Sequence, residues 1–145
     1  MEYPEVDAQI FRTKDGTFES VTYREMFQIA LDFAAGLLNQ GVKRGDLIGL
    51  ISDNRKEWQQ ADIGIMSIGA IDVPRGCDAT LIDLEGILSV TECKLVIAEN
   101  SAQVNKILSL KENVFSISYD NDILELLKYI LNPYDFFINS KNIID

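Results

Sequence analysis

Short, unbroken apolar runs alternate with helical patterns between residues 22 and 98, and this alternation constrains the fold more than any other feature of the 145-residue sequence. Residues 47–51 and 94–98 have the pattern of strands that are buried on both faces of a parallel sheet. Another strand is expected at 71–73, where Pro74 should stop it because proline has no amide for the ladder. Strands separated by helices imply right-handed crossovers. The sequence therefore predicts an α/β fold, a mostly parallel sheet with helices on its faces.

Capping residues indicate where two of the helices begin. Thr22 and Glu25 have the spacing of a capping box, in which the Thr22 hydroxyl accepts a hydrogen bond from the Glu25 amide. The apolar positions that follow recur every three or four residues, and Gly41 can end this helix in a left-handed conformation. Thr80 and Asp83 repeat the capping-box spacing before the strand expected at 94–98. Both helices are expected to pack an apolar face on the sheet.

The helix expected between the strands at 47–51 and 71–73 has a different capping residue. Asn54 is expected to cap it, with Glu57 at the third helical position. At 100° per residue, one side of this helix carries an apolar stripe formed by Trp58, Ala61, Ile65 and Ile68. Asp62 falls on the other side with Arg55 and Gln59. We therefore interpret Asp62 as solvated or paired with arginine, and not as a buried catalytic acid.

A small β-hairpin is expected before the first helix. Asp15-Gly16 lies between two short β-prone runs at 10–12 and 18–21, and Asp-Gly is a common hairpin turn. The main α/β body should therefore be preceded by a short antiparallel unit.

The composition changes after Ala102, beyond which neither glycine nor alanine occurs. Ile, Asn, Phe, Tyr and Lys make up 20 of the 35 residues from 111 to 145. A half-exposed strand is expected at 115–119 and a capped helix at 122–131. We therefore divide the chain into residues 1–110 and a divergent tail, 111–145.

Charge and residue content exclude several classes of function. The formal net charge of −10 argues against a nucleic-acid partner, because binding to the phosphate backbone depends largely on Lys and Arg. No apolar run approaches the ~20 residues that span a bilayer, and the first residues do not resemble a signal peptide, so a cytoplasmic location is expected. The sequence contains no histidine, which removes Ser-His and Cys-His catalysis and His metal sites.

Several ordered motifs resemble the adenylate-forming, or AMP-binding, superfamily. Residues 22–26 (Thr-Tyr-Arg-Glu-Met) resemble its first conserved motif, and residues 66–74 (Met-Ser-Ile-Gly-Ala-Ile-Asp-Val-Pro) resemble its second. Residues 41–58 keep the order and spacing that the family has between these motifs. The continuation at 74–78, Pro-Arg-Gly-Cys-Asp, looks like the bacterial long-chain fatty acid CoA ligase branch. The resemblance extends over about 18–100.

This resemblance implies that residues 1–110 are the N-terminal segment of an acyl-CoA synthetase-like domain. Full-length members use ATP and Mg²⁺ to convert a fatty acid to an acyl-adenylate, and then transfer the acyl group to CoA. Their phosphate loop, their ribose-binding and magnesium-binding acids and their late catalytic lysine have no counterpart in this sequence. We therefore expect an inactive fragment with no catalytic residue and no bound cofactor. The divergent tail would fit a truncated or frameshifted reading frame.

Arg75 is the one side chain that we retain as a candidate for anion contact. It follows a strand at the carboxyl end, where ligands of α/β proteins tend to bind, although an ordinary surface role is the simpler interpretation. Residues 64–69 have the glycine spacing of a nucleotide phosphate loop. Ala70-Ile71 stand where such a loop has Lys-Ser/Thr, so we interpret this segment as helix packing.

Two aspartates and two cysteines have the side chains of possible site residues, but their positions indicate structural roles. Asp53 is interpreted as a helix cap and Asp78 as a residue that closes a loop. Cys77 and Cys93 have neither a metal spacing nor a disulfide pattern, so no metal site is expected.

An alternative from another class is a stand-alone, non-catalytic α/β interaction module, such as a receiver-like domain. Asp53 would be its acceptor residue, but no clear later strand supplies the lysine that a receiver needs. If the sheet is incomplete, its exposed edge is also expected to favour self-association.

Overall fold

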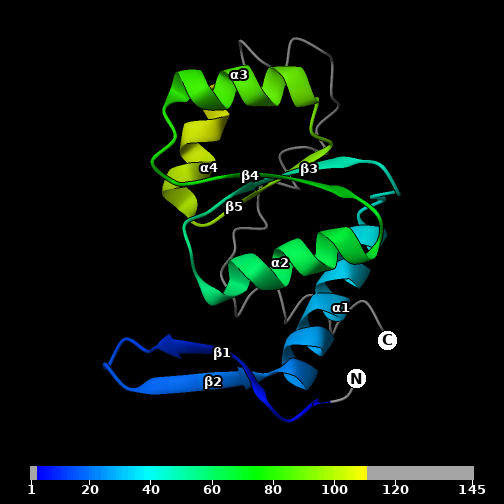
Figure 1. Ribbon diagram of the computed structural model, residues 1–145. Coiled ribbons are helices and arrows are strands. Elements are labelled where there is room, and N and C mark those ends of the chain that lie inside the picture. The colour runs from blue at the N-terminus through cyan, green and yellow to red at the C-terminus, as the bar shows by residue number, and fades with distance from the viewer. Residues whose placement is uncertain (1–2, 111–145) are drawn as a thin grey trace.

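Figure 1 shows the computed structural model of the chain, in which residues 3–110 are described. The elements are β1 (Asp7–Arg12), β2 (Phe18–Thr22), α1 (Tyr23–Asn39), β3 (Leu47–Ile51), α2 (Lys56–Ser67), β4 (Ile71–Arg75), α3 (Leu81–Thr91), β5 (Leu95–Ala98) and α4 (Ser101–Leu108). The strand predicted at 115–119 and the helix predicted at 122–131 lie outside the described residues.

The predicted α/β architecture is confirmed. β3, β4 and β5 form a parallel sheet in the order β4-β3-β5. α3 and α4 cover one face of the sheet, α2 lies on the other, and α1 packs beside α2 (Figure 1). β1 and β2 form the predicted antiparallel hairpin, in which Gly16 has the positive φ of +90° that its turn requires.

Two capping boxes begin helices where the sequence predicts them. The Thr22 side chain accepts from the Glu25 amide, and the Glu25 carboxylate accepts from the Thr22 amide at 2.8 Å. Thr80 and Asp83 make the same pair of bonds at the start of α3. Gly41 follows α1 with φ of +78°, as expected of a residue that ends a helix in the left-handed region.

Two boundary predictions are wrong, and each has a physical reason. β4 continues through Pro74 to Arg75. Among the described residues β4 is an edge strand, so one side of its backbone pairs with no other strand and a proline without an amide hydrogen is tolerated there. The N-cap of α2 is Arg55 and not Asn54, and no side chain caps this helix. Arg55 has an extended backbone conformation, so the helix begins at Lys56, one residue later than a cap at Asn54 would place it.

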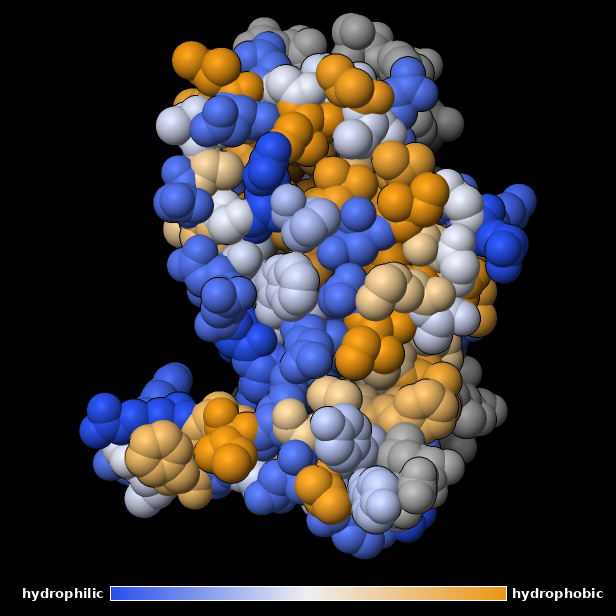
Figure 2. All heavy atoms as spheres, viewed as in Figure 1, coloured by the Kyte–Doolittle hydropathy of each residue, from blue (hydrophilic) through white to orange (hydrophobic). Residues whose placement is uncertain are grey.

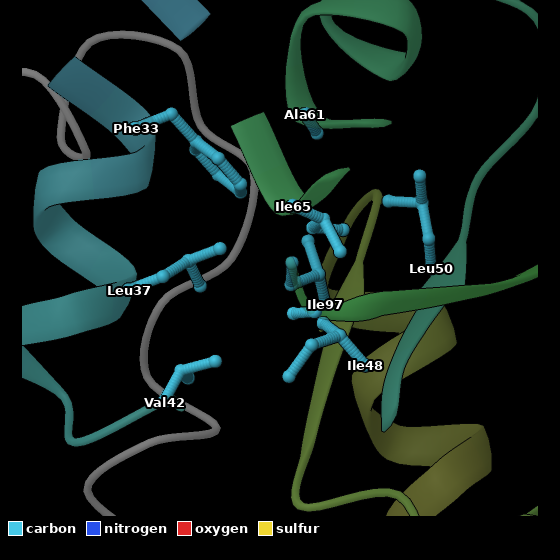
Figure 3. Close-up of a cluster of buried hydrophobic side chains, with 9 residues drawn as sticks. Phe33, Leu37, Val42, Ile48, Leu50, Ala61, Ile65 and Ile97 are labelled. Atoms are coloured by element: carbon cyan, nitrogen blue, oxygen red, sulfur yellow. The ribbon is translucent and has the colours of Figure 1, made fainter. Parts of the chain in front are cut away.

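Two apolar clusters hold the layers together, one on each face of the sheet. In Figure 3, Phe33 and Leu37 extend from α1 towards Ile65 of α2 and the strand residues Ile48 and Ile97. The cluster on the opposite face joins the sheet to α3 and α4 through Ile51, Leu84, Leu88, Ala98, Val104, Ile107 and Leu110. Each fully buried aliphatic side chain contributes about 1.5–3 kcal/mol, so the sheet is fixed from both sides.

The hairpin is attached to the start of α2. Gln9 donates from Nε2 to the carbonyl oxygen of Lys56 at 3.1 Å and to Oε1 of Gln59 at 3.0 Å. The Lys56 ammonium lies 3.9 Å from the centre of the Phe11 ring. These contacts fix the hairpin beside the N-terminal end of α2, near the carboxyl ends of the parallel strands.

Candidate functional site

The carboxyl ends of β3, β4 and β5 meet at one edge of the sheet, where ligands of open α/β proteins commonly bind. Asp53 lies two residues beyond β3, Cys77 lies two residues beyond β4, and Glu99 directly follows β5. These three residues form a cluster that we call the carboxyl-edge cluster. One ligand atom from each lies within 4.8 Å of the others.

Glu99 is the centre of this cluster. Its Oε2 accepts from the Asp53 amide at 2.8 Å, from the Ser52 hydroxyl at 3.2 Å and from the Cys77 thiol at 3.4 Å. Arg55 Nη1 lies 3.9 Å from its Oε1. Burial alone would raise the pKa of Glu99, but these donors and the arginine together lower it below its usual value. Glu99 is therefore an ionised acceptor that joins β5 to the loop after β3.

Cys77 anchors the loop that follows β4. Its amide donates to Asp53 Oδ1 at 2.9 Å, and its carbonyl oxygen accepts from Gln103 Nε2 at 3.4 Å and Lys106 Nζ at 3.2 Å. Burial, followed by the hydrogen bond and charge of Glu99, raises the pKa of the Cys77 thiol to about 11. Because only the thiolate is a good nucleophile, we expect Cys77 to react slowly at neutral pH, and its backbone hydrogen bonds hold the loop in place.

The role predicted for Asp53 is therefore wrong. Its carboxylate does not cap α2 but accepts the Cys77 amide, so it joins the loops after β3 and β4. Asp78 is exposed in the loop where it was predicted, and its Oδ1 lies 2.6 Å from the position that a Cβ would take on Gly76. A side chain at position 76 would therefore require the Asp78 carboxylate to move aside.

The carboxyl-edge cluster contains oxygen and sulfur atoms that could coordinate a metal ion, but these atoms already take part in hydrogen bonds within the protein. Asp53 Oδ1 and Glu99 Oε2 accept backbone amides, and the raised pKa of Cys77 disfavours the thiolate that binds metals. The arrangement is that of a hydrogen-bonded clamp between three loops. The expectation that the chain holds no metal stays a prediction.

Arg75 lies at the same edge, at the end of β4. Its backbone carbonyl accepts from the Ser52 amide at 2.9 Å, and the residue is exposed. Within residues 3–110, its guanidinium makes no ion pair, whereas Arg55 is paired with Glu57 at 2.7 Å. The Arg75 side chain is exposed at the carboxyl edge of the sheet, and its role in anion contact stays a prediction.

The segment 64–69 is the end of α2, as the sequence predicts, and not a phosphate loop. A Cβ on Gly64 would lie 2.7 Å from Phe33 Cδ1 and 2.9 Å from the Ala30 carbonyl oxygen, so this glycine permits the close approach of α1. Gly69 has φ of +74° in the turn from α2 to β4. Both glycines are needed for packing and backbone conformation.

Asp62 has a neighbour that the sequence analysis missed. It is partly buried on α2, and its carboxyl group lies within hydrogen-bonding reach of another carboxyl group, that of Asp72 on β4. The expected pairing with arginine is wrong, since Arg55 pairs with Glu57 and Glu99. A pattern of helix faces could not reveal this contact, because it depends on how β4 returns beside α2.

Three comparisons with known proteins bear on this geometry. The AMP-binding enzyme family model matches residues 1–131. The chain belongs to the AMP-binding enzyme family. The family match covers most of the chain, so it supports adenylate-forming kinship over a receiver-like module.

Curated relatives include fatty acid ligases. A chloroplastic long-chain-fatty-acid–acyl-carrier-protein ligase of Arabidopsis thaliana is 37% identical over 87 residues, which are 60% of this chain and 12% of the relative. A long-chain-fatty-acid–CoA ligase of Mycobacterium tuberculosis is 28% identical over 103 residues, 71% of this chain and 17% of the relative. The chain thus spans less than a fifth of the length of either relative.

Solved structures of adenylate-forming enzymes share the fold of this AMP-binding family member. An anthranilate CoA ligase in complex with anthranoyl-AMP superimposes with a TM-score of 0.67 at 24% identity, over 78% of this chain and 21% of that chain. A fatty acid AMP ligase from Legionella pneumophila gives a TM-score of 0.61 at 24% identity, over 71% and 18%. The arrangement of sheet, helices and hairpin is therefore that of this enzyme class.

Proposed function

We propose that this chain is the N-terminal scaffold of a ligase that activates long-chain fatty acids. The observation that carries the proposal is the 37% identity with a long-chain-fatty-acid–acyl-carrier-protein ligase over 60% of the chain, within an AMP-binding family match. Enzymes of this family use ATP, Mg²⁺ and CoA. In the complete enzyme, a fatty acid would form an acyl-adenylate and then a thioester.

The scaffold by itself would not perform this reaction. Phosphoryl and adenylyl transfer require cations placed around the phosphates. At the carboxyl edge, Arg55 is paired with Glu57, and Lys106 donates to the carbonyl oxygens of Cys77 and Ala79. Arg75 makes no ion pair within residues 3–110, but a single arginine does not surround the phosphates of ATP, so no step is assigned to the described residues. The fragment status and inactivity are parts of this proposal.

ATP–pyrophosphate exchange with palmitate tests the inactivity of the chain alone. The expected result is exchange no greater than that of a buffer blank, with the Mycobacterium tuberculosis ligase as the positive control. Turnover above background that survives repurification would overturn the proposed inactivity.

A chimaera tests the scaffold role directly. The segment that matches residues 18–100 would replace its counterpart in the Mycobacterium tuberculosis ligase, and the chimaera is expected to retain palmitate activation. A second chimaera with Gly64→Val should lose it, because the added side chain would collide with Phe33 and the Ala30 carbonyl. A first chimaera that folds and is inactive would argue against an equivalent scaffold.

Self-association of the separate chain is part of the same proposal. Within the described residues, no strand pairs with the outer side of β4 or of β5. Figure 2 shows apolar residues exposed among polar ones, and the exposed apolar residues include Met66, Ile71, Leu81, Ile82 and Val90. An edge strand with apolar neighbours favours pairing with a second copy. Light scattering should show a mass that rises with concentration, and a constant monomer mass would contradict this.

Within residues 3–110, no helix has the length and apolar character to cross a membrane. A cytoplasmic location therefore stays a proposal, which localisation of a tagged full chain would test.

A further inference from the structure

Asp72 is placed on the α2 side of the sheet by its position in β4. It pairs in register with Ile48 of β3, a fully buried residue of the cluster that packs against α2. Residues in register on parallel strands point to the same face. The Asp72 carboxyl therefore points towards α2, which carries Asp62.

The Asp72 carboxyl has no conventional partner there. Its Oδ1 is buried and receives no hydrogen bond from a protein donor. The Asp62 carboxyl group lies within hydrogen-bonding reach of the Asp72 carboxyl group, and two carboxyl groups can form a hydrogen bond only while they share a proton. If both ionise, two negative charges face each other in a partly buried site.

No cation in the described part of the chain compensates this pair. Asp62 and Asp72 take part in none of the ion pairs among residues 3–110. Arg44 lies against Gly69 at the turn from α2 to β4, and Lys94 is paired with Asp46 at 2.9 Å. Neither is among the charges that act on Asp72. Cys93, just before β5, is the other ionisable group that senses Asp72, through repulsion of its thiolate.

We propose that the Asp62–Asp72 carboxyl pair is a pH-sensitive latch, which fastens edge strand β4 to α2 while it shares a proton and loosens that strand when both groups ionise. β4 is held by β3 on one side only among the described residues, so the latch supplies a second attachment. The strand ends at Arg75 and leads into the loop that Asp53 and Cys77 hold. Loosening β4 would therefore also disturb the loop after β4 at the carboxyl edge of the sheet.

The pH window follows from the direction of the shift. Burial, followed by the charge and hydrogen bond of Asp62, raises the pKa of Asp72 from 3.8 to about 7. A carboxyl group with a raised folded-state pKa stabilises the fold fully below its unfolded pKa, and this contribution is lost as the pH rises through the folded value. The latch should therefore be closed in mild acid and open above neutrality.

Carbon-13 NMR titration of the side-chain carboxyls of the full chain tests the shared proton. One carboxyl of the pair should titrate near neutrality in the wild type, and Asp62→Asn should lower the midpoint of Asp72. Glu19→Gln removes an exposed carboxylate from the hairpin and should leave both midpoints unchanged. Titration of both Asp62 and Asp72 near their ordinary values would overturn the proposal.

Hydrogen exchange tests the effect on β4. After correction for intrinsic rates, amide protection across residues 68–78 should fall roughly tenfold between pH 6 and pH 8.5 in the wild type. The fall is limited to about this size because the latched Asp72, with a pKa of about 7, itself ionises within that range. Asp72→Asn should remove this fall, while Glu19→Gln keeps it. An equal fall in α3 and β4, or no dependence on Asp72, would overturn the latch. Because Asn has nearly the shape of Asp, the variant is expected to fold, and Asp62→Asn provides an independent second variant.

These outcomes are separate from the proposed ligase scaffold. The latch concerns only the ionisation of two carboxyl groups and the opening of one strand. An inactive chimaera would leave the titration result standing, and a normal titration would leave the scaffold proposal standing.

Discussion

Gly64 of α2 lies directly against Phe33 of α1, so closely that a Cβ on Gly64 would stand 2.7 Å from Phe33 Cδ1. The backbone carbonyl of Ala30 would lie 2.9 Å away and cannot rotate aside. Two helices that approach this closely share a tightly packed contact. The glycine is therefore a requirement of the α1–α2 contact.

Gly64→Ala should destabilise the chain by about 1–3 kcal/mol, because overpacking a dense contact forces side chains and backbone to shift. Gly86→Ala is the matched control, since it lies within α3 and has nothing within 4 Å of the added methyl. That control should stabilise the chain by about 0.4–1 kcal/mol. Urea denaturation measures both changes, and equal effects of the two substitutions would contradict the role of Gly64.

Much of this fold could be predicted because its signals are local. The bonds between Thr22 and Glu25 span three residues, so the sequence shows the α1 cap directly. The continuous apolar run of β3 likewise indicates by itself that both faces of this strand are buried. Local signals failed where a neighbour in space decided the outcome. Pro74 was expected to stop a strand, and its place at the sheet edge allows the strand to continue.

The contacts of the candidate site could not be predicted from spacing. Asp53 and Cys77 are 24 residues apart, and Glu99 is 46 residues from Asp53. Each residue is an ordinary loop side chain in the sequence. Only the parallel order β4-β3-β5 brings their strand ends together. A prediction of the strand order, and not of the motifs alone, would have been needed to find the cluster.

Glu99→Gln should make Cys77 more reactive towards iodoacetamide. Burial raises the pKa of the Cys77 thiol, and the hydrogen bond and charge of Glu99 raise it further, to about 11. Glutamine keeps an acceptor for the Asp53 amide without the charge. The midpoint of the rate against pH should therefore move lower, with about tenfold more thiolate per unit of pKa.

The alkylation experiment uses a Cys93→Ser background so that only one thiol reacts. Glu19→Gln serves as a control for loss of a distant charge, and its rate profile should match that of the parent. If Glu99→Gln leaves the midpoint unchanged, Glu99 does not control the thiol in solution.

Thr80→Ala should lower the free energy of unfolding by about 1 kcal/mol, the usual cost of removing an N-cap hydroxyl. In α3 the Thr80 hydroxyl accepts from the Asp83 amide at 3.2 Å and donates to Asp83 Oδ2 at 2.7 Å. Thr80→Ser retains the hydroxyl and should keep most of the stability. Chemical denaturation distinguishes the two variants, and equal losses would indicate that the methyl group and not the cap is important.

Acid should destabilise the chain through the same capping boxes. Hydrogen bonds from the Thr22 amide and hydroxyl lower the pKa of Glu25 below its ordinary 4.5, and bonds from Thr80 lower the pKa of Asp83 below 3.8. A lowered folded-state pKa stabilises the fold fully above the unfolded value, and the contribution is lost as the pH falls through the folded value. Asp72 acts with the opposite sign, since its raised pKa weakens the fold on the alkaline side.

Glu25→Gln separates the charge from the geometry of the box, because glutamine also accepts the Thr22 amide. Its urea midpoint should change less between about pH 5 and pH 3 than that of the wild type, since one acid that binds a proton on unfolding has been removed. Glu19→Gln, at an exposed position of the hairpin, should keep the wild-type slope. If Glu25→Gln and wild type lose stability in parallel, ionised Glu25 does not stabilise the start of α1, and the acid sensitivity has to come from Asp83 and the other hydrogen-bonded carboxylates.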